Sequence, residues 1–322
     1  MHKSGDVALV GRTNVGKSTF LNTALGEPLA IISSRPQTTR DTLLGVVIWK
    51  DSEIALIDNP GFHRPHNELG IRMNSAAMNC LVSADLVLLV ADAEQLQRES
   101  KSRSRNSSAF DDERRLIAAM PEHTPCVIVL NKIDKLAKKT SLLPLLAELD
   151  TLRPSTPVVP VSSLLRSDVE RVLDVIGQLL PAGPNRYPTD TLTDRPVRYF
   201  AAEYIREQAM RTTSGEIPFA VAVKLDDFSE YPSVTVIKAT ICVEKAGQRV
   251  ILIGSGGRQI REIGILSRQR IEGLLKTQVH LELFVQTKKQ WRDSRVALDD
   301  LGYARLDSVR TMTNRTTGRG QS

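Results

Sequence analysis

The chain has 322 residues, of which 41% are hydrophobic, and it carries a net charge of +6 with a pI of about 9.3. This length and composition predict a soluble globular protein with two domains, and no uninterrupted apolar run approaches the length of a membrane-spanning helix. The first expected strand begins within a few residues of Met1, so we expect no signal or transit peptide and a cytoplasmic location.

Residues 11–18, with the sequence GRTNVGKS, follow the apolar run 7–10 and match the pattern G-x-x-x-x-G-K-[ST]. Glycines at both ends of the pattern let backbone N–H groups surround a phosphate without Cβ clashes. Lys17 would reach the β- and γ-phosphates, and the Ser18 hydroxyl would take an oxygen position on Mg²⁺. A helix over residues 19–25 would direct its N-terminal dipole at the same anions. A chance Gly-rich turn is the alternative interpretation.

Short apolar runs alternate with helical patterns along the first half of the chain. This alternation predicts an α/β fold with a doubly wound, mostly parallel sheet. Ligands bind such sheets beyond the carboxyl ends of the strands, so the polar residues after each run are candidate site residues. The runs cover residues 6–10, 43–49, 54–58, 86–91, 126–130 and 158–161.

Two polar segments are expected to sense the terminal phosphate. Residues 33–41 have no apolar period and predict a loop, which in a nucleotide switch supplies a threonine hydroxyl to Mg²⁺. Thr39 is the preferred ligand and Thr38 is the alternative. After the strand 54–58, Asp58 would hold Mg²⁺ through water and the Gly61 N–H would contact the γ-phosphate. An ordinary surface loop and a common turn are the competing interpretations.

The segment Asn131-Lys132-Ile133-Asp134 follows the strand 126–130 and predicts which base is bound. Guanine offers two neighbouring N–H donors that one carboxylate, Asp134, can accept, whereas adenine offers no such pair. Asn131 would tie this segment to the phosphate-binding loop, and the Lys132 stem would cover the base. Residues 162–164 could donate a backbone N–H to guanine O6.

Together these motifs resemble the translation-factor-related GTPases, and in particular the Era family. The family usually has Thr where this chain has Asn59, and Ser-Ala where it has Ser-Ser at 162–163. Residues 95–111 form a Ser/Arg-rich stretch that we expect to be a flexible surface insertion. The resemblance implies hydrolysis of GTP to GDP with Mg²⁺, and Asn14 is by the same resemblance a candidate K⁺ ligand.

The catalytic contacts are expected from Lys17, Thr39 and Gly61. Phe62 and His63 follow Gly61, with no glutamine to orient water, which predicts slow intrinsic hydrolysis. The residues expected to bind the nucleotide and its metal are Gly11, Arg12, Thr13, Asn14, Val15, Gly16, Lys17, Ser18, Thr19, Thr39, Asp58, Asn59, Pro60, Gly61, Asn131, Lys132, Asp134, Ser162, Ser163 and Leu164.

A Pro/Gly-rich break after a predicted helix at 168–180, capped by Ser167, indicates a domain boundary. We expect a nucleotide-binding domain over residues 1–181, a Pro-rich linker over 182–194, a second domain over 195–303 and a disordered basic tail over 304–322. The elements expected in the second domain are a helix at 195–210, strands at 219–225, 234–243 and 279–285, an extended segment at 250–253 and a helix at 266–275 after an interruption at Gly264.

The second part of the chain carries all the excess positive charge, because residues 185–322 contain 22 Lys and Arg against 16 Asp and Glu. The run Gly254-Ser255-Gly256-Gly257 has the G-x-x-G pattern of a KH domain of type II, an α+β fold, with Arg258 and Arg261 opening the next helix. Such a loop lets an RNA backbone lie against glycines and basic side chains. In isolation the pattern is weak, and a tight turn is the alternative.

The resemblance to the Era family implies a monomer that binds 16S ribosomal RNA near its 3′ end and acts in assembly of the 30S ribosomal subunit. Two other functions remain open. A membrane-associated signalling GTPase would use the basic second domain to meet anionic lipid, which would place the protein peripherally at the inner face of the membrane. An RNA-binding scaffold would show little hydrolysis.

Overall fold

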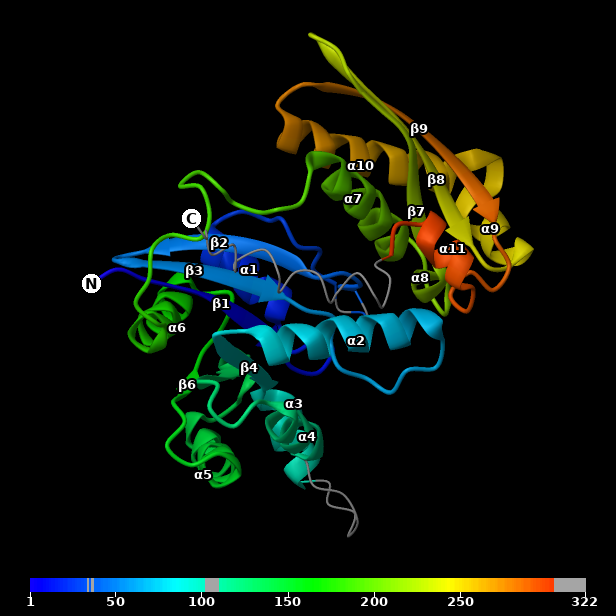
Figure 1. Cartoon of the computed structure of the whole chain (residues 1–322). Helices are drawn as coiled ribbons and strands as arrows, with labels where there is room; N and C mark the ends of the chain where they lie inside the picture. Colours follow the sequence, from blue (N-terminus) through cyan, green and yellow to red (C-terminus); the bar gives the residue numbers. More distant parts are fainter. Residues whose placement is uncertain (34, 36–37, 102–109, 304–322) are drawn as a thin grey trace.

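The computed structural model describes residues 1–33, 35, 38–101 and 110–303. Two sheets organise these residues, one of six strands in the first half of the chain and one of three strands in the second (Figure 1). Within the described residues, no helix is both long and apolar enough to cross a membrane. The predicted tail at 304–322 lies outside the described residues.

The first sheet has the strand order β2-β3-β1-β4-β5-β6, and β2 is antiparallel to β3 while the other neighbours are parallel. This confirms the predicted mostly parallel, doubly wound sheet. Its strands are β1 Lys3–Val10, β2 Leu43–Trp49, β3 Ser52–Asp58, β4 Leu86–Asp92, β5 Cys126–Asn131 and β6 Val158–Pro160.

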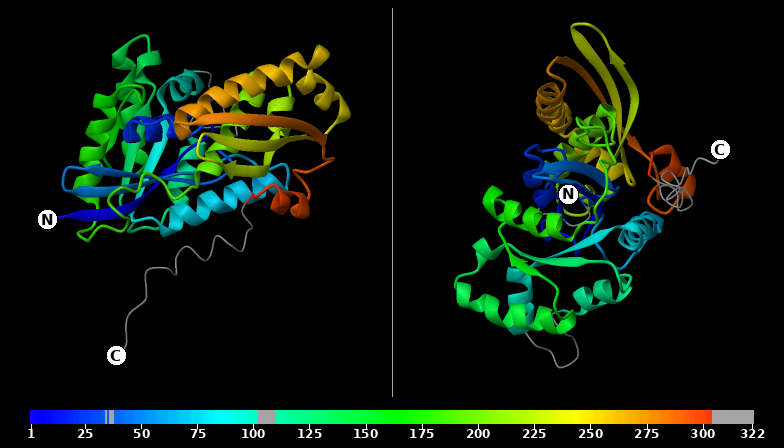
Figure 2. Two further views of the ribbon diagram at one scale, coloured as in Figure 1. Left: turned by 90° about the horizontal axis from the view of Figure 1, so that it is seen from above. Right: turned by 60° about the vertical axis from the view of Figure 1, so that its left-hand side comes forward.

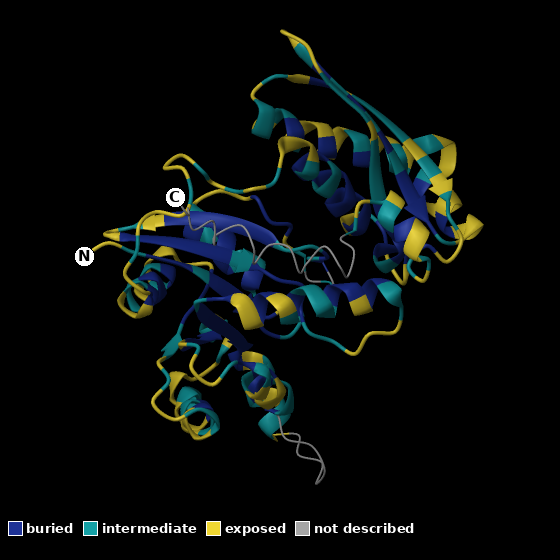
Figure 3. Cartoon of the chain, in the orientation of Figure 1, coloured by how far each residue is buried: buried dark blue, intermediate teal, exposed yellow. Residues whose placement is uncertain are grey.

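Helices cover both faces of this sheet, which explains why its central strands are apolar throughout rather than alternating. On β1, Val7 and Leu9 belong to the cluster that α1 and α6 complete, while Ala8 and Val10 belong to the cluster on the opposite face. Figure 3 shows these central strands as buried. The covering helices are α1 Lys17–Leu25 and α6 Arg166–Leu179 on one face, and α2 Glu68–Ser83, α3 Ala93–Lys101, α4 Asp111–Ala119 and α5 Leu142–Leu152 on the other.

The second sheet has the order β7-β8-β9, with β7 antiparallel and β9 parallel to β8. Helices α7 and α10 pack against it and against each other, which gives the predicted α+β arrangement. Its elements in chain order are α7 Val197–Arg211, α8 Ile217–Ala220, β7 Ala222–Glu230, β8 Val234–Val243, α9 Ala246–Ile253, α10 Arg258–Leu275, β9 Gln278–Thr287 and α11 Arg295–Asp300.

Two predictions for the second domain are wrong. The segment 250–253 is not extended but ends helix α9, in which the Gln248 side chain accepts hydrogen bonds from the backbone N–H groups of Glu244 and Lys245 and so closes the first turn. Gly264 does not interrupt a helix either. It lies inside the continuous helix α10, where a Cβ would meet only the Leu283 side chain at 3.6 Å.

Other element boundaries also differ from the predictions, three of them in ways that have a local cause. Residues 217–220 form the short helix α8 because Pro218 occupies its first turn, so the strand begins at Ala222 rather than at 219. Ser167 is not a cap, since α6 begins at Arg166 with Leu165 as its N-cap. Residues 95–101 are helical because Leu96 is buried against the sheet, and Phe110 and Asp111 are the N-cap and first residue of α4, so the prediction of a flexible insertion is wrong at both ends. Residues 102–109 of that prediction lie outside the described residues.

The two halves contact each other along two lines. In both views of Figure 2 the start of α2 lies beside α11. There Arg72 pairs with Asp299 at 2.8 Å, and Arg295 pairs with Glu68 at 3.1 Å. The second line runs from the loop before β2 to α7 and α8.

The segment 182–194 is bound to the first sheet. The Val46 N–H donates to the Leu192 carbonyl at 3.0 Å, and the Glu53 carboxylate accepts from the Arg186 N–H at 2.6 Å. The Arg186 guanidinium also pairs with Asp85 at 2.6 Å. These bonds fix the path of the chain between the two sheets.

Candidate functional site

The loop between β1 and α1 has a backbone that requires its glycines. Gly11 and Gly16 have φ values of 151° and 105°, in the range that residues with a Cβ rarely adopt. A Cβ on Gly11 would lie 2.2 Å from the Val90 carbonyl oxygen, and one on Gly16 would lie 2.3 Å from Asn131 Nδ2. The loop therefore has the close-fitting curvature that a phosphate cradle needs.

Lys17 lies at the start of α1 with its ammonium group inside this loop. Its Nζ donates to the carbonyls of Arg12 at 2.9 Å and Gly11 at 3.3 Å. Burial lowers the pKa of Lys17 to about 8, and the negative charge of Asp58 opposes that shift. A phosphate entering the loop would add a second negative charge close to this ammonium.

Three oxygen-bearing side chains from separate segments meet beside Lys17. Ser18 Oγ lies 2.6 Å from Asp58 Oδ2 and 2.9 Å from Thr39 Oγ1, and Thr39 Oγ1 lies 3.4 Å from the same Asp58 oxygen. Asp58 is fully buried, which raises the pKa of its carboxyl group, and its Oδ1 has no hydrogen-bond partner among the residues that the structure describes. A buried carboxylate with an unused oxygen beside two hydroxyls fits a hard, oxygen-liganded cation such as Mg²⁺.

The geometry separates the two candidate threonines. Thr38 Oγ1 donates to the Arg35 carbonyl at 2.8 Å, away from the metal position, whereas Thr39 faces Ser18 and Asp58. Thr39 is therefore the residue of this loop that the structure brings to the site.

The segment after β3 closes the opposite side of the loop. A Cβ on Gly61 would come within 2.7 Å of Thr13 Cα, so the backbone of Gly61 lies directly against the phosphate-binding loop. The Asn59 side chain points into the core instead, where it donates to the carbonyls of Leu9 at 3.3 Å and Ile57 at 3.0 Å. Only the backbone of Asn59 can face a nucleotide.

The segment after β5 joins the loop as the sequence predicts. Asn131 Nδ2 donates to the Val15 carbonyl at 2.7 Å, and Asn131 Oδ1 accepts from the Ser163 N–H at 2.9 Å. Lys132 Nζ donates to the Asn14 carbonyl at 2.5 Å. Asp134 is exposed, in the 3₁₀ turn Ile133–Lys135, where it could meet a base from the cleft.

Two of the three backbone N–H groups of residues 162–164 have partners within the protein. The Ser162 N–H donates to Asp168 Oδ2 at 2.8 Å and the Ser163 N–H is occupied by Asn131. Leu164, which follows them, is 72% exposed. Neither of these two hydrogen bonds uses its backbone N–H, so this N–H is the candidate donor to guanine O6.

A cleft of about 390 Å³ lies over these groups. Some of its contributors were not predicted: Ile31 and Ile32 come from an apolar pair before the loop, and Lys135 follows Asp134 by one residue. Asp92, which binds Lys132 Nζ at 2.6 Å, ends β4 one residue beyond the predicted strand. The lining residues are Thr13, Asn14, Gly16, Lys17, Ser18, Thr19, Ile31, Ile32, Ser33, Thr38, Thr39, Gly61, Lys132 and Lys135.

The Arg12 side chain is directed away from the cleft. Its guanidinium pairs with Glu99 of α3 at 2.9 Å and with Asp112 of α4 at 3.2 Å. Arg12 thus holds the phosphate-binding loop against the two helices that flank residues 102–109, and its contribution to a nucleotide contact would come from its backbone.

The second candidate site is a groove of about 510 Å³ beside the glycine-rich loop. Gly254, Gly256 and Gly257 have φ values of 71°, 58° and 74°. Ser255 and Arg258 are exposed on the loop and the following turn, while Arg261 reaches the groove itself. The lining residues are Gly257, Ile260, Arg261, Gly264, Ile265, Arg268, Val279, His280, Leu281 and Leu283.

This groove has the composition of a single-stranded RNA site, with glycines and arginines along one side and apolar side chains as its floor. Sequence reasoning found the loop and Arg261 but not Arg268 or His280. Helical spacing from Arg261 to Arg268 was the available signal, and the predicted break at Gly264 hid it.

Comparison with known proteins identifies relatives over nearly the whole chain. Residues 6–132 match the family of 50S ribosome-binding GTPases, and residues 216–292 match the KH domain family. The GTPase Era of Xanthomonas campestris pv. campestris strain B100 is 38% identical over 303 residues, covering 94% of this chain and 98% of the relative. That of Lacticaseibacillus paracasei is 38% identical over 307 residues, covering 95% and 98%.

Two solved structures have the same two-part architecture. A crystal structure of Era in complex with MgGDPNP and nucleotides 1506–1542 of 16S ribosomal RNA superposes with a TM-score of 0.87 at 36% identity, covering 95% of this chain and all of that one. An alanine variant of Aquifex aeolicus Era bound to GDP and AlF4⁻ gives a TM-score of 0.85 at 35% identity, covering 94% of this chain and all of that one.

Proposed function

This chain belongs to the Era family of GTPases, and from that membership and the geometry of its two sites we propose that it is a GTP-hydrolysing switch that binds 16S ribosomal RNA near its 3′ end and acts in assembly of the 30S subunit. The meeting of Ser18, Thr39 and Asp58 beside Lys17 carries the proposal. The RNA is inferred from the relative that was crystallised with nucleotides 1506–1542.

In this proposal the backbone of residues 11–18 cradles the phosphates and Lys17 contacts the β- and γ-phosphates. Ser18 and Thr39 would hold Mg²⁺ directly and Asp58 through water, and the ion would neutralise charge on the phosphate oxygens. Gly61 would offer its N–H to the γ-phosphate. Positioning and charge neutralisation supply most of the acceleration in such a reaction.

Intrinsic hydrolysis is expected to be slow. Phe62 and His63 follow Gly61, and the His63 ring is tied to the backbone because its Nδ1 lies 2.9 Å from the Gly61 carbonyl. No side chain at these two positions offers the amide that orients water in related switches. An activating partner or RNA would then set the rate in the cell.

The test of guanine recognition is D134N. Asp134 would accept both N1–H and N2–H₂ of guanine, and an asparagine in its place offers an amide donor suited to the C2 carbonyl of xanthine. We expect the wild-type chain with Mg²⁺ to bind GTP and release phosphate, and D134N to prefer XTP over GTP. Absence of GTP binding by the wild type would overturn the proposal.

The RNA partner is tested by crosslinking the full chain in GTP and in GDP, followed by sequencing of the attached RNA. The proposal places the nucleotide site within residues 1–181 and the RNA site within 195–303 of a cytoplasmic monomer. Enrichment of the 3′ end of 16S rRNA in the GTP sample is expected. Binding to anionic vesicles that RNA does not compete away would instead favour the membrane-associated function.

Asn14 is proposed as a ligand for K⁺. It is exposed in the phosphate-binding loop with φ 63°, beside the position that the phosphates would take. If K⁺ assists hydrolysis there, turnover in KCl should exceed turnover in NaCl at equal ionic strength. Equal rates would remove K⁺ from the proposal.

A further inference from the structure

The loop that carries Thr39 is held on both sides by arginine–carbonyl hydrogen bonds to the second domain. Two of these arginines lie in the loop and donate to carbonyls of the second domain. The other two lie in the second domain and donate to carbonyls of the loop or of the residue after it. The four bonds are Arg35 Nη2 to the Thr213 carbonyl at 2.5 Å, Arg206 Nη2 to the Thr38 carbonyl at 2.6 Å, Arg40 Nη1 to the Val221 carbonyl at 2.6 Å, and Arg195 Nη2 to the Thr42 carbonyl at 2.7 Å.

Arg40, the residue after Thr39, is buried in the second domain with only 5% of its surface exposed. It also donates to the Phe219 carbonyl at 3.0 Å and to the Tyr303 hydroxyl at 2.9 Å, and more weakly to Pro218 at 3.5 Å. Within the described residues, carbonyl and hydroxyl oxygens are its acceptors, and they include carbonyls that the short helix α8 leaves unpaired at its C-terminal end. Moving Arg40 would therefore leave a buried charge and buried carbonyls without partners.

Arg206, which binds the residue before Thr39, is equally fixed. It is 1% exposed, and Glu203 holds its guanidinium in a bidentate pair at 2.6 and 2.7 Å. Because that pair sets the plane of the guanidinium, the second N–H of Nη2 points at the Thr38 carbonyl at 2.6 Å, and Nη1 donates to Met210 Sδ at 3.3 Å. Helix α7 thus holds the backbone of the residue before Thr39.

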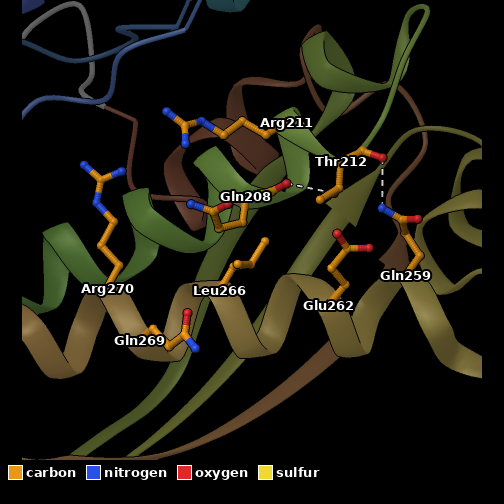
Figure 4. Close-up of a pocket in the computed structure, with 8 residues that line it drawn as sticks. All are labelled: Gln208, Arg211, Thr212, Gln259, Glu262, Leu266, Gln269 and Arg270. Atoms are coloured by element: carbon orange, nitrogen blue, oxygen red, sulfur yellow. Dashed lines mark hydrogen bonds between the residues drawn. The ribbon is translucent and has the colours of Figure 1, made fainter.

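The same helix is connected to the glycine-rich loop. Gln259, in the first turn of α10, donates from Nε2 to the Thr212 carbonyl at 2.8 Å, at one end of the cleft between α7 and α10 (Figure 4). A Cβ on Gly254 would lie 2.7 Å from Gln259 Cβ, so this glutamine packs directly on the loop. The next carbonyl after Thr212, that of Thr213, is the acceptor for Arg35.

We propose that Arg40 and Arg206 are positioning residues for GTP hydrolysis, which hold Thr39 beside Ser18 and Asp58, at the expected metal position, through hydrogen bonds between its loop and the RNA-binding domain. This inference rests on the proposed function. RNA in the groove would change the GTP preference of the chain through the contacts of these two arginines, and by linkage GTP would change RNA affinity by the same factor.

A double-mutant cycle tests the proposal in the full-length chain. The measured quantity is the ratio of the dissociation constants for GDP and for GDPNP, both with Mg²⁺, in the wild type, R206M, T39A and the double variant. Each single variant should lower the preference for GDPNP. If Arg206 acts through Thr39, the double variant should resemble T39A alone, because the contact that Arg206 positions is already missing.

Hydrolysis provides the second readout. R206M should lower kcat by between about tenfold and about 10²-fold, as expected for a misplaced catalytic contact, with a smaller change in GDP affinity. R40M should behave alike, and its melting temperature shows whether it folds. R295Q is the matched control, because it removes an arginine contact between the domains that does not reach the Thr39 loop. For R295Q the ratio of the GDP and GDPNP dissociation constants should stay within about twofold of the wild-type value.

The inference would be overturned if R206M and T39A changed the ratio of the GDP and GDPNP dissociation constants independently, so that their fold-changes multiplied in the double variant. It would also be overturned if R295Q changed this ratio as much as R206M does. Failure of the wild type to bind either nucleotide would instead overturn the proposed function, so the two failures are distinguishable.

Discussion

The nucleotide site and the glycine-rich groove achieve binding in different ways. In the first, Lys17 and Asp58 are buried charges and the glycines are needed because a Cβ would collide with neighbouring atoms. In the second, a Cβ on Gly256 or Gly257 would meet no described residue within 4 Å, and the positive φ values of these residues favour glycine. One site is fixed by the fold before its ligand arrives, whereas the other is a shaped surface. Substitutions should therefore have much larger effects in the first.

The largest effect is expected from K17M. The methionine preserves much of the buried volume but removes the ammonium group that would contact the phosphates. Loss of one such charge-stabilising contact typically lowers kcat by roughly 10²–10³-fold. Phosphate release under single-turnover conditions measures it. A loss smaller than about tenfold would show that this buried charge is not the dominant electrostatic contact.

A pH effect on stability should come from Glu113, a buried carboxyl group of the first domain. Burial raises the pKa of Glu113 in α4 from 4.5 to about 7, and the Arg12 guanidinium opposes that shift. The folded state then binds a proton more readily than the unfolded state, so the free energy of unfolding falls as pH rises from about 4.5 to about 7. The loss is at most about 3 kcal/mol.

In E113Q the glutamine side chain is neutral at every pH, so the free energy of unfolding of this variant should not fall between pH 4.5 and about pH 7 for this reason. Above pH 7 the variant should be more stable than the wild type by up to about 3 kcal/mol, and the difference should shrink toward pH 4.5. Thermal unfolding at pH 5 and pH 8 measures the difference. An equal difference at both values would mean that protonation of Glu113 does not cause it.

In the groove, R261A should weaken RNA binding only several-fold. Arg261 is exposed and would contact a phosphate rather than a base, so the loss should be uniform across RNA sequences and the salt dependence should fall by about one unit of slope. Titrations at several salt concentrations measure both. R114A, which removes an exposed arginine far from the groove, is the control, and an equal loss for this variant would contradict the assignment.

The smallest effect is expected where the two sites are connected. Q259L removes the hydrogen bond to the Thr212 carbonyl. Loss of one hydrogen bond of ordinary strength should reduce the influence of RNA on the GTP to GDP preference by roughly threefold. Nucleotide affinities with and without RNA measure this influence. An unchanged influence would show that the connection runs through other contacts.

Sequence reasoning succeeded where a local pattern is sufficient. Ser18, Thr39 and Asp58 were expected at one site and the structure brings them together. Ser18 and Asp58 follow or end the parallel strands β1 and β3, whose carboxyl ends meet at one edge of the sheet, and Thr39 precedes β2, whose antiparallel direction puts its amino end at the same edge. It failed for residues 250–253, whose β-branched composition favours a strand. Their neighbours bury only Leu252 of that run and leave Val250 69% exposed, which is a helical pattern of burial.

The contacts between the domains could not be predicted from the sequence. Arg40 and Val221 are 181 positions apart, and no periodicity or motif relates them. Arg206 is similar, since a buried arginine in a helix does not indicate which carbonyl it will meet. The motif that contains Asn59 also could not predict where its side chain points, because the carbonyls that accept its hydrogen bonds belong to β1 and β3.

The path of residues 182–194 has a consequence for dissecting this protein. β2 is the outer strand of its sheet, and the Leu192 carbonyl takes up the Val46 N–H while Tyr187 packs on Leu44 and Val46. A fragment truncated after residue 181 would uncover this strand and give neighbouring molecules a template for intermolecular pairing. An isolated fragment intended for crystallisation or kinetics should therefore retain residues through 194 to remain free of self-association.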